Sequence, residues 1–371
     1  MKILILSNDA FTLCRFRGHL VREMVSKNHR VLACCPPVDK KMIENVRQLG
    51  AEYVPMPMNR TGLNPFQDII YFFRLIHFFY SQKPDILLSY TIKPVIYGSL
   101  AAWMTGIQKV FSLIPGLGYA FVGGTMRQKM LAGMVERLYR KALKNNQAVF
   151  FQNPDDQNIF IQKKLISSRQ AVLLCGSGIP LEEFAFVRPY CTPCSFFLMG
   201  RMLADKGFRE FIEAARRIKR AHPEIVFKLA GATDENPSSI SLAEIQGWVK
   251  EGVVEYTGFV EDVRPLLQKT SVFVLPSYYR EGVPRSILEA LAMGRPIITT
   301  DMPGCRETVI HGDNGFLIPP KNIPALQHAM EQFITNPSLI ESMGLKSRQL
   351  AEQKFNIHYI NQSILQTMEL T

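Results

Sequence analysis

Two glutamates in one short stretch of the chain have the residue type and spacing of a ligand-binding loop. Glu281 and Glu289 lie in the stretch PSYYREGVPRSILEALAMGRP, residues 276–296. An apolar run before it, residues 272–275, predicts a buried strand, and the pattern after Pro284 predicts a helix. Glu281 therefore falls in the loop and Glu289 on the helix. Carboxylates accept hydrogen bonds from hydroxyl groups, so a polyhydroxylated ligand would suit both.

The segment between the two glutamates has the features of an anion site. Backbone N–H groups within the stretch 282–285 are expected to point at an anion, and the start of the helix adds partial positive charge. We therefore predict that Gly282, Val283 and Pro284 lie against a phosphate group.

Two cations follow another predicted strand. Arg201 and Lys206 come directly after the apolar run 195–199. Gly200 allows close approach of the backbone, and Gly207 opens the next helix. Two fixed cations at the end of a strand can hold a diphosphate, because charge-assisted hydrogen bonds are strong.

These residues need a scaffold of strands and helices, and the hydrophobic pattern predicts one. Strands are predicted at residues 2–7, 30–35, 85–89, 109–113 and 148–152, and then at 195–199, 227–230, 253–257, 272–275, 296–299 and 315–318. Helices are predicted at residues 16–27, 40–49, 64–80, 95–104, 126–144, 207–221, 241–249, 263–269 and 285–292, with further long helices at the end. Strands separated by such helices indicate βαβ units and parallel sheets. We expect an α/β protein with two Rossmann-like, doubly wound domains facing each other across a cleft, with ligands at the carboxyl ends of the strands.

The domain boundaries follow from composition. Residues 1–170 are expected to form the first domain, and residues 171–194, with three prolines between 180 and 193, the linker. Residues 195–345 form the second domain, and helices in 346–371 are expected to pack back on the first.

The net charge of +11 lies entirely in the first half of the 371-residue chain. Residues 1–170 carry 23 Lys and Arg against 10 Asp and Glu. Such asymmetry predicts an anionic partner for that half. No nucleic-acid-binding motif accompanies the charge, so nucleic acid is not expected.

Two helices of this half could meet a membrane surface. Residues 126–144 combine a basic face with apolar residues, and residues 66–80 are crowded with Phe and Tyr. Both features are typical of helices that lie on an anionic bilayer. A core helix with a solvated basic face explains them equally well. No signal peptide or membrane span is visible, and the seven cysteines, odd in number, suit a reducing compartment.

The second half resembles the family 4 retaining glycosyltransferases, whose fold is called GT-B. Residues 276–296 match the family's E-x7-E motif. Further family-like segments are GSGI at 176–179, LMGRMLADKG at 198–207, TGFV at 257–260 and GDNGFLIP at 312–319. In the first half, TIKP at 91–94 and GLG at 116–118 resemble the branch that builds capsule, O-antigen and related bacterial glycans on a polyprenyl diphosphate.

The resemblance assigns a role to each candidate residue. It implies that Arg201 and Lys206 neutralise the leaving diphosphate, Glu281 holds the transferred hexose and Glu289 holds the ribose. Val260, Gly116 and Gly118, in matching segments, are expected to line the donor site. The chain lacks the Asp-x-Asp metal motif of the other large glycosyltransferase fold, so no metal and no cofactor is expected. The implied reaction retains the anomeric configuration, and a donor phosphate oxygen takes the acceptor's proton.

The first half departs from the family pattern at two positions, and both concern the acceptor side of the site. Many relatives carry a glycine pair after the first strand, where this chain has SNDA at 7–10, and a first-domain histidine where it has SLIPG at 112–116. We therefore assign no catalytic histidine.

The sequence predicts a retaining glycosyltransferase at the cytoplasmic face of a bacterial plasma membrane, bound peripherally. The expected donor is a UDP-linked hexose or N-acetylhexosamine, and the expected acceptor is a polyprenyl-diphosphate-linked sugar. Two alternatives are a sugar-nucleotide epimerase of the same architecture, which would lack the combination of motifs, and a non-catalytic partner subunit. The sugar, base and linkage are not fixed by the motifs.

Overall fold

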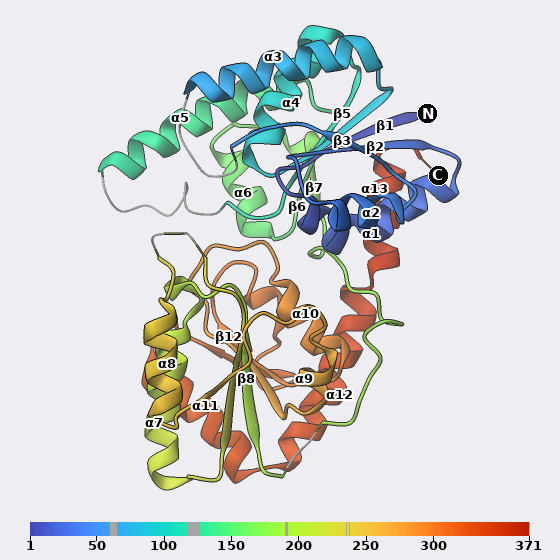
Figure 1. Cartoon of the computed structure of the whole chain (residues 1–371). Helices are drawn as coiled ribbons and strands as arrows, with labels where there is room; N and C mark the ends of the chain where they lie inside the picture. Colours follow the sequence, from blue (N-terminus) through green and yellow to red (C-terminus); the bar gives the residue numbers. More distant parts are fainter. Residues whose placement is uncertain (60–64, 118–125, 190–191, 235, 237, 371) are drawn as a thin grey trace. The chain divides into compact units, whose positions relative to one another are not determined.

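The computed structural model describes residues 1–59, 65–117, 126–189, 192–234, 236 and 238–370, without the side chains of 126–129. The chain divides into two units, each with its own sheet (Figure 1). The first unit comprises Met1–Gly178 and Ile357–Thr371, and the second comprises Ile179–Asn356.

The first unit contains a seven-stranded parallel sheet in the order β3-β2-β1-β4-β5-β6-β7. Its strands are β1 (Lys2–Leu6), β2 (Arg30–Cys35), β3 (Glu52–Pro55), β4 (Ile86–Tyr90), β5 (Lys109–Ile114), β6 (Ala148–Phe151) and β7 (Ala171–Leu173). Its helices are α1 (Ala10–Ser26), α2 (Lys40–Arg47), α3 (Pro65–Gln82), α4 (Ile92–Thr105), α5 (Met126–Ala142), α6 (Pro154–Gln162) and α13 (Ile357–Thr367).

Helices cover both faces of the first sheet, because its strands are apolar on both sides. In β1, Ile3 and Ile5 belong to a core cluster with buried residues of α1 and α13. Leu4 and Leu6, which point to the other face, cluster with buried residues of α3 and α4. Figure 1 shows α1, α2 and α13 on one side of this sheet and α3 and α4 on the other.

The second unit contains a six-stranded parallel sheet in the order β10-β9-β8-β11-β12-β13. Its strands are β8 (Ser195–Met199), β9 (Val226–Ala230), β10 (Glu255–Tyr256), β11 (Val272–Leu275), β12 (Ile297–Thr300) and β13 (Gly315–Ile318). Its helices are α7 (Phe208–Ala221), α8 (Leu242–Lys250), α9 (Arg264–Gln268), α10 (Arg285–Ala292), α11 (Ile323–Thr335) and α12 (Ser338–Lys354). The two parallel sheets with their helices confirm the expected α/β class of two doubly wound domains.

Two segments near the expected boundaries fall differently from the sequence analysis. Strand β7 lies within residues 171–194, expected as a linker, yet it pairs with β6 in the first sheet. The terminal segment 346–371 divides between the units: α12 ends in the second, and α13 belongs to the first. The apolar side of α13 explains its place, since Ile364 is fully buried in the core beside α1.

The strand order reverses beside the first strand of each sheet. In the second unit, β8 pairs with β9 on one side and with β11 on the other. From this point the chain proceeds to β9 on one side and, after β11, to β12 on the other, and ligands of doubly wound sheets bind at the carboxyl ends of the strands where the order reverses in this way. The predicted cations follow β8, and Glu281 follows β11.

Candidate active site

The loops after β8 and β11 are fixed to each other by backbone contacts. The carbonyl oxygen of Asp205 accepts hydrogen bonds from the backbone amides of Tyr278 and Tyr279, at 2.9 and 3.0 Å. At Gly207, whose φ is +83°, a Cβ atom would lie only 2.3 Å from the carbonyl oxygen of Pro276. Glycine is therefore required here, because any side chain would separate the two loops.

Lys206 and Glu281 come into direct contact across these loops. The Lys206 Nζ atom lies 2.5 Å from Glu281 Oε2, and the two side chains are only 11% and 14% exposed. The sequence assigned one to the diphosphate and the other to the sugar. The structure brings them together as an ion pair, which leaves this point of the site electrically neutral and shielded from solvent.

Arg201 lies on the more exposed side of the same loop. Its side chain is 49% exposed, and Nη1 lies 3.1 Å from Asp234 Oδ2 in the loop after β9. Burial raises the pKa of the nearby Tyr279 hydroxyl, and the charge of Arg201 opposes the rise. The Lys206 Nζ atom lies 5.8 Å from the centroid of the Tyr279 ring. Tyr279 thus lies close to both predicted cations.

Cys305 lies beside the ion pair from the loop after β12. Its side chain is fully buried. Burial, followed by the negative charge of Glu281, raises the pKa of the Cys305 thiol to about 12, and Lys206 acts in the opposite direction. Cys305 is therefore a neutral thiol at physiological pH, and it contributes no charge to the site.

Glu289 is buried on α10, with 1% of its surface exposed. Its Oε1 atom lies 3.4 Å from Arg285 Nε, one helical turn earlier. Pro284 is the N-cap residue, directly before α10. Gly282 lies so close to the loop after β12 that a Cβ on Gly304 would be 1.4 Å from its carbonyl oxygen. Val283 is buried beside it.

The remaining predicted residues are placed as follows. Val260 is half-buried in the loop after β10, whose Gly258 carbonyl accepts a 2.8 Å hydrogen bond from the Gly231 amide. The loop after β10 therefore lies at the same end of the sheet as the loops after β8 and β9. Gly116 follows β5 in the first unit, and Gly118 lies outside the described residues. In the described part of the chain, His, Cys, Asp and Glu form no cluster that could hold a metal ion.

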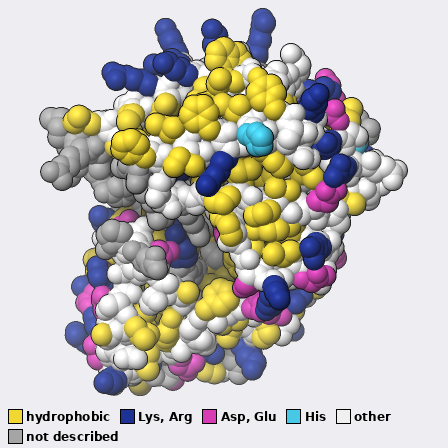
Figure 2. Space-filling view, turned by 45° about the horizontal axis from the view of Figure 1, so that its top comes forward, with side chains coloured by type: hydrophobic (Ala, Val, Ile, Leu, Met, Phe, Trp, Pro, Cys, Tyr) yellow, Lys and Arg dark blue, Asp and Glu magenta, His cyan; other side chains and the backbone are white. Residues whose placement is uncertain are grey.

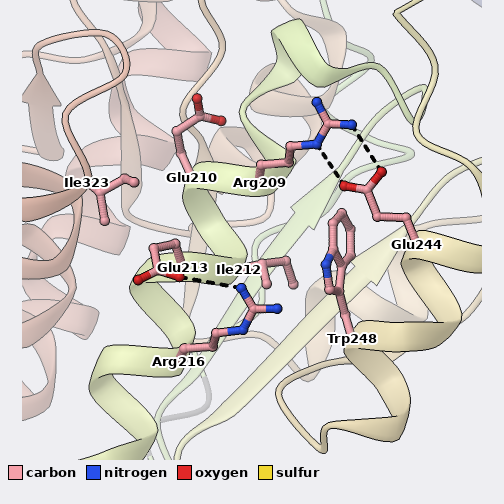
Figure 3. A pocket seen from close by; sticks show the side chains of 8 residues that line it. All are labelled: Arg209, Glu210, Ile212, Glu213, Arg216, Glu244, Trp248 and Ile323. Atoms are coloured by element: carbon pink, nitrogen blue, oxygen red, sulfur yellow. Dashed lines mark hydrogen bonds and ion pairs between the residues drawn. The ribbon is translucent and has the colours of Figure 1, made fainter.

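A separate pocket of about 320 Å³ lies between α7, α8 and the start of α11 (Figure 3). Its charged side chains largely pair with one another. Arg209 makes two hydrogen bonds to Glu244, at 2.7 and 3.0 Å, and Arg216 contacts Glu213 at 3.4 Å. None of the predicted site residues lines the pocket. The Arg209–Glu244 pair is sufficiently explained by holding α7 against α8, and the Arg216–Glu213 pair lies within α7.

The sequence analysis missed contributions that are visible only in the fold. The Asp205 carbonyl and the Ser277 hydroxyl join the two loops, although they are 72 residues apart. Ser277 Oγ also lies 3.0 Å from Glu281 Oε1, within hydrogen-bonding distance. Both residues lie in stretches that the analysis quoted, but serine and a backbone carbonyl carry no charge signal that would single them out.

Large apolar side chains are exposed on three helices of the first unit, α3, α4 and α5. They are Phe66, Ile69, Ile70, Phe73 and Tyr80 of α3, Trp103 and Met104 of α4, and Met130 and Met134 of α5. The α3 residues recur at helical spacing on its outer side, while Tyr71, Leu75 and Phe79 face the core. Figure 2 shows hydrophobic side chains gathered on this face with Lys and Arg nearby. We call these nine residues the α3–α5 apolar surface.

Two family profiles match the chain, one in each unit. The profile described as "Glycosyl transferase 4-like domain" matches residues 15–176, and "Glycosyl transferases group 1" matches residues 193–336. The chain is 27% identical, over 95% of its length and 94% of the relative's, to an N,N'-diacetylbacillosaminyl-diphospho-undecaprenol α-1,3-N-acetylgalactosaminyltransferase of Campylobacter jejuni. It is 26% identical, over 82% of its length and 81% of the relative's, to the capsular polysaccharide biosynthesis glycosyltransferase CapM of Staphylococcus aureus.

Solved structures share the fold at low sequence identity. The Anabaena protein Alr3699/HepE, solved with UDP and glucose, matches with a TM-score of 0.78 over all of both chains at 18% identity. A sucrose-phosphate synthase from Thermosynechococcus elongatus matches with a TM-score of 0.79 over all of this chain and 98% of its own, at 16% identity.

Proposed function

The chain belongs to the family 4, or group 1, glycosyltransferases, and we propose that it transfers a hexose or N-acetylhexosamine from a UDP-sugar to a polyprenyl-diphosphate-linked sugar. The observation that carries the proposal is the contact between Lys206 and Glu281 at the point where the second sheet's strand order reverses. A cation for a diphosphate and a carboxylate for sugar hydroxyls are adjacent there, as a nucleotide sugar requires. The Campylobacter jejuni relative, named for a diphospho-undecaprenol-linked acceptor, supports the acceptor class.

In the proposed reaction the donor's diphosphate takes Lys206 and Arg201, while Glu281 binds hydroxyls of the transferred sugar and Glu289 binds the ribose. The bond between the anomeric carbon and the diphosphate oxygen breaks as the acceptor oxygen bonds to that carbon on the same face. A donor phosphate oxygen accepts the acceptor's proton, so the configuration is retained. The two cations stabilise the negative charge that develops on the leaving diphosphate.

The proposed reaction uses no metal ion. In this scheme Lys206 and Arg201 supply the positive charge that a divalent cation supplies in other transferases. Their position after β8 supports that role, because ligands of doubly wound sheets bind at the carboxyl ends of the strands where the strand order reverses.

We further propose that the first unit docks on the inner face of a bacterial plasma membrane, where a polyprenyl-linked acceptor would reside. The α3–α5 apolar surface supports this docking, since aromatic and aliphatic side chains gain free energy in the interfacial region of a bilayer. Exposed Arg137, Lys141 and Lys144 on or just after α5 are complementary to anionic lipid. Within the described residues, no helix has the length and apolar character that crossing a bilayer demands.

Incubation of the purified protein with a panel of nucleotide sugars and a polyprenyl-diphosphate-linked acceptor tests the function. We expect UDP release that depends on the acceptor, together with a product one sugar longer. Interconversion of the nucleotide sugar without acceptor would identify an epimerase instead. Donor binding without turnover for any acceptor would favour a non-catalytic partner.

A further inference from the structure

The carboxylate of Glu281 is held at both of its oxygen atoms. Lys206 contacts Oε2, and the hydroxyl of Ser277 donates to Oε1 at 3.0 Å. Ser277 is fully buried, two residues after β11. Its carbonyl oxygen accepts a hydrogen bond from the Thr300 hydroxyl, which ties it to the end of β12. A residue anchored to the sheet therefore fixes the position of one carboxylate oxygen.

The geometry also indicates where the Ser277 proton lies. The hydroxyl accepts a 3.2 Å hydrogen bond from the Tyr279 amide and has one proton to donate. It lies 3.0 Å from Glu281 Oε1 and 3.3 Å from the Asp205 carbonyl oxygen. The carboxylate is closer and charged, and the Asp205 carbonyl already accepts two backbone amides. The proton is therefore directed to Glu281, because hydrogen bonds to charged acceptors are the stronger ones.

We propose that Ser277 is a positioning residue that keeps Glu281 oriented toward the transferred sugar when Lys206 turns to the donor's diphosphate. The inference rests on the proposed function, in which Lys206 and Glu281 contact different parts of one donor. A diphosphate attracts Lys206 away from Oε2. Ser277 keeps its hold on Oε1 meanwhile, because the hydroxyl is fixed by the sheet and not by the lysine.

Kinetics of Ser277→Ala test the proposal. We expect kcat to fall about 10-fold, since a hydrogen bond to a charged group is lost, while the affinity for UDP stays within about two-fold of wild type. The same substitution in a Glu281→Ala background should cause no further loss, because Ser277 acts through that carboxylate. Turnover of the Glu281→Ala variant is measured with excess enzyme, so that a slow rate remains detectable.

Ser271 provides a matched control at the other end of β11. Ser271 is also fully buried, and its hydroxyl accepts a 2.9 Å hydrogen bond from the Ser195 amide at the start of β8. This is the amino end of the strands, whereas Glu281 follows their carboxyl end. Ser271→Ala should lower the melting temperature as Ser277→Ala does, with kcat unchanged. If Ser277→Ala does not fold, Ser277→Cys fills the same space with a poorer donor and should lower kcat in the same direction, against Ser271→Cys as its control.

The outcomes separate this inference from the proposed function. Wild-type kcat in a folded Ser277→Ala variant overturns the inference and leaves the transferase function standing. So does an equal loss in Ser271→Ala, or a further loss of about 10-fold when Ser277→Ala is added to Glu281→Ala. Absence of acceptor-dependent UDP release from the wild-type protein contradicts the proposed function, and the inference with it.

Discussion

Lys206 and Glu281 neutralise each other, and this contact sets the behaviour expected of single substitutions. The pair is little exposed, so solvent screens it weakly. Arg201 and Asp234 are 49% and 27% exposed, and an exposed pair of this kind contributes little to stability. The two predicted diphosphate ligands thus differ in their structural surroundings, although the proposed reaction uses both.

Replacing either cation should slow the reaction, but only one replacement should unfold the protein more easily. We expect Lys206→Ala and Arg201→Ala each to reduce kcat/KM by roughly 10–100-fold. Lys206→Ala should also lower the melting temperature, because Glu281 loses its nearby cation in a poorly solvated place. Arg201→Ala should melt close to wild type. Steady-state kinetics and thermal unfolding measure both effects, and wild-type rates in either variant would remove that residue from the diphosphate site.

The two glutamates should separate in binding experiments. Glu289→Gln is expected to weaken binding of free UDP, because Glu289 is assigned to the ribose. Glu281→Gln should leave UDP affinity nearly unchanged and lower turnover. Calorimetry with UDP distinguishes them, and the opposite pattern would mean that their roles are exchanged.

Activity should persist when divalent cations are removed. In the proposed mechanism, side chains supply the positive charge that neutralises the leaving diphosphate, so EDTA removes nothing that the reaction needs. The measurement is UDP release before and after exhaustive chelation. A loss that Mg²⁺ or Mn²⁺ restores would contradict the proposal.

At the scale of single residues, the sequence identified the charged residues of the site but not the partners that they contact in the fold. Lys206 and Glu281 stood out by type and spacing, and the structure brings them into contact. Ser277 did not, since its role depends on a neighbour that only the loop geometry supplies. The partner of Arg201, Asp234, lies 33 residues further along, and no local pattern links the two.

At the scale of strands and helices, the sequence likewise predicted the elements that carry a buried apolar run and missed features that lack one. The apolar runs predicted the inner strands of both sheets, but β3 and β7 were missed. These are the outermost strands of the first sheet, and their residues are partly exposed, so they lack a buried apolar run. The start of α1 was placed at residue 16, whereas the helix begins at Ala10. Asp9 caps it by accepting a hydrogen bond from the Thr12 amide, a signal that the hydrophobic pattern does not contain.

The α3–α5 apolar surface and the basic side of α5 should act together on a bilayer. We expect the protein to bind vesicles that contain anionic lipid and to be released as salt rises, because charge attraction is screened over about 8 Å at physiological ionic strength. Phe66→Ser with Phe73→Ser should weaken binding at any salt concentration. Replacing Arg137, Lys141 and Lys144 by Gln should weaken it most at low salt, by about 1 kcal/mol for each charge lost.

Arg140 is left unchanged in that variant, because its guanidinium donates to the carbonyl oxygens of Lys163 and Lys164 and has a packing role. The control removes three exposed charges from the second unit, Arg220, Lys250 and Lys346, and should bind vesicles like wild type. Turnover of a short water-soluble acceptor should survive in all these variants. No binding to either neutral or anionic vesicles would return α3 and α5 to the alternative of core helices with a solvated basic face. Equal binding to both would exclude the attraction to anionic lipid and leave only the apolar contact.

At the scale of the whole molecule, the first unit is built from two separate pieces of chain. Its last piece, Ile357–Thr371, follows the complete second unit. Ile360, Ile364 and Leu365 of α13 are at most 5% exposed in the core beside α1, and Asn361 donates a 2.7 Å hydrogen bond to Glu23. The helix is thus part of the first unit's core.

Truncation after Asn356 should unfold the first unit and spare the second. Burial of each large apolar side chain contributes about 1.5–3 kcal/mol. Losing several of them therefore removes a large part of a typical domain's free energy of unfolding, which is about 5–15 kcal/mol. Calorimetry should show one melting transition lost and one kept. Tyr359→Ala, on the exposed side of the same helix, is the control and should melt like wild type. Two intact transitions in the truncated chain would show that α13 is dispensable.

The two-piece construction also fixes an order of events on the ribosome. Protein synthesis delivers residues 1–178 before residues 179–356, and the helix that completes the core of the first unit emerges only after both. Domains usually fold from the N-terminus as they are made. Here the first unit stays unfinished, with the surface that α13 covers still open, until residues 357–371 have emerged. The second unit, made of one continuous segment, is complete before it. The unit whose sheet is made earlier is therefore completed later, and a chain released before residues 357–371 are made carries a finished second unit and a first unit with an open core.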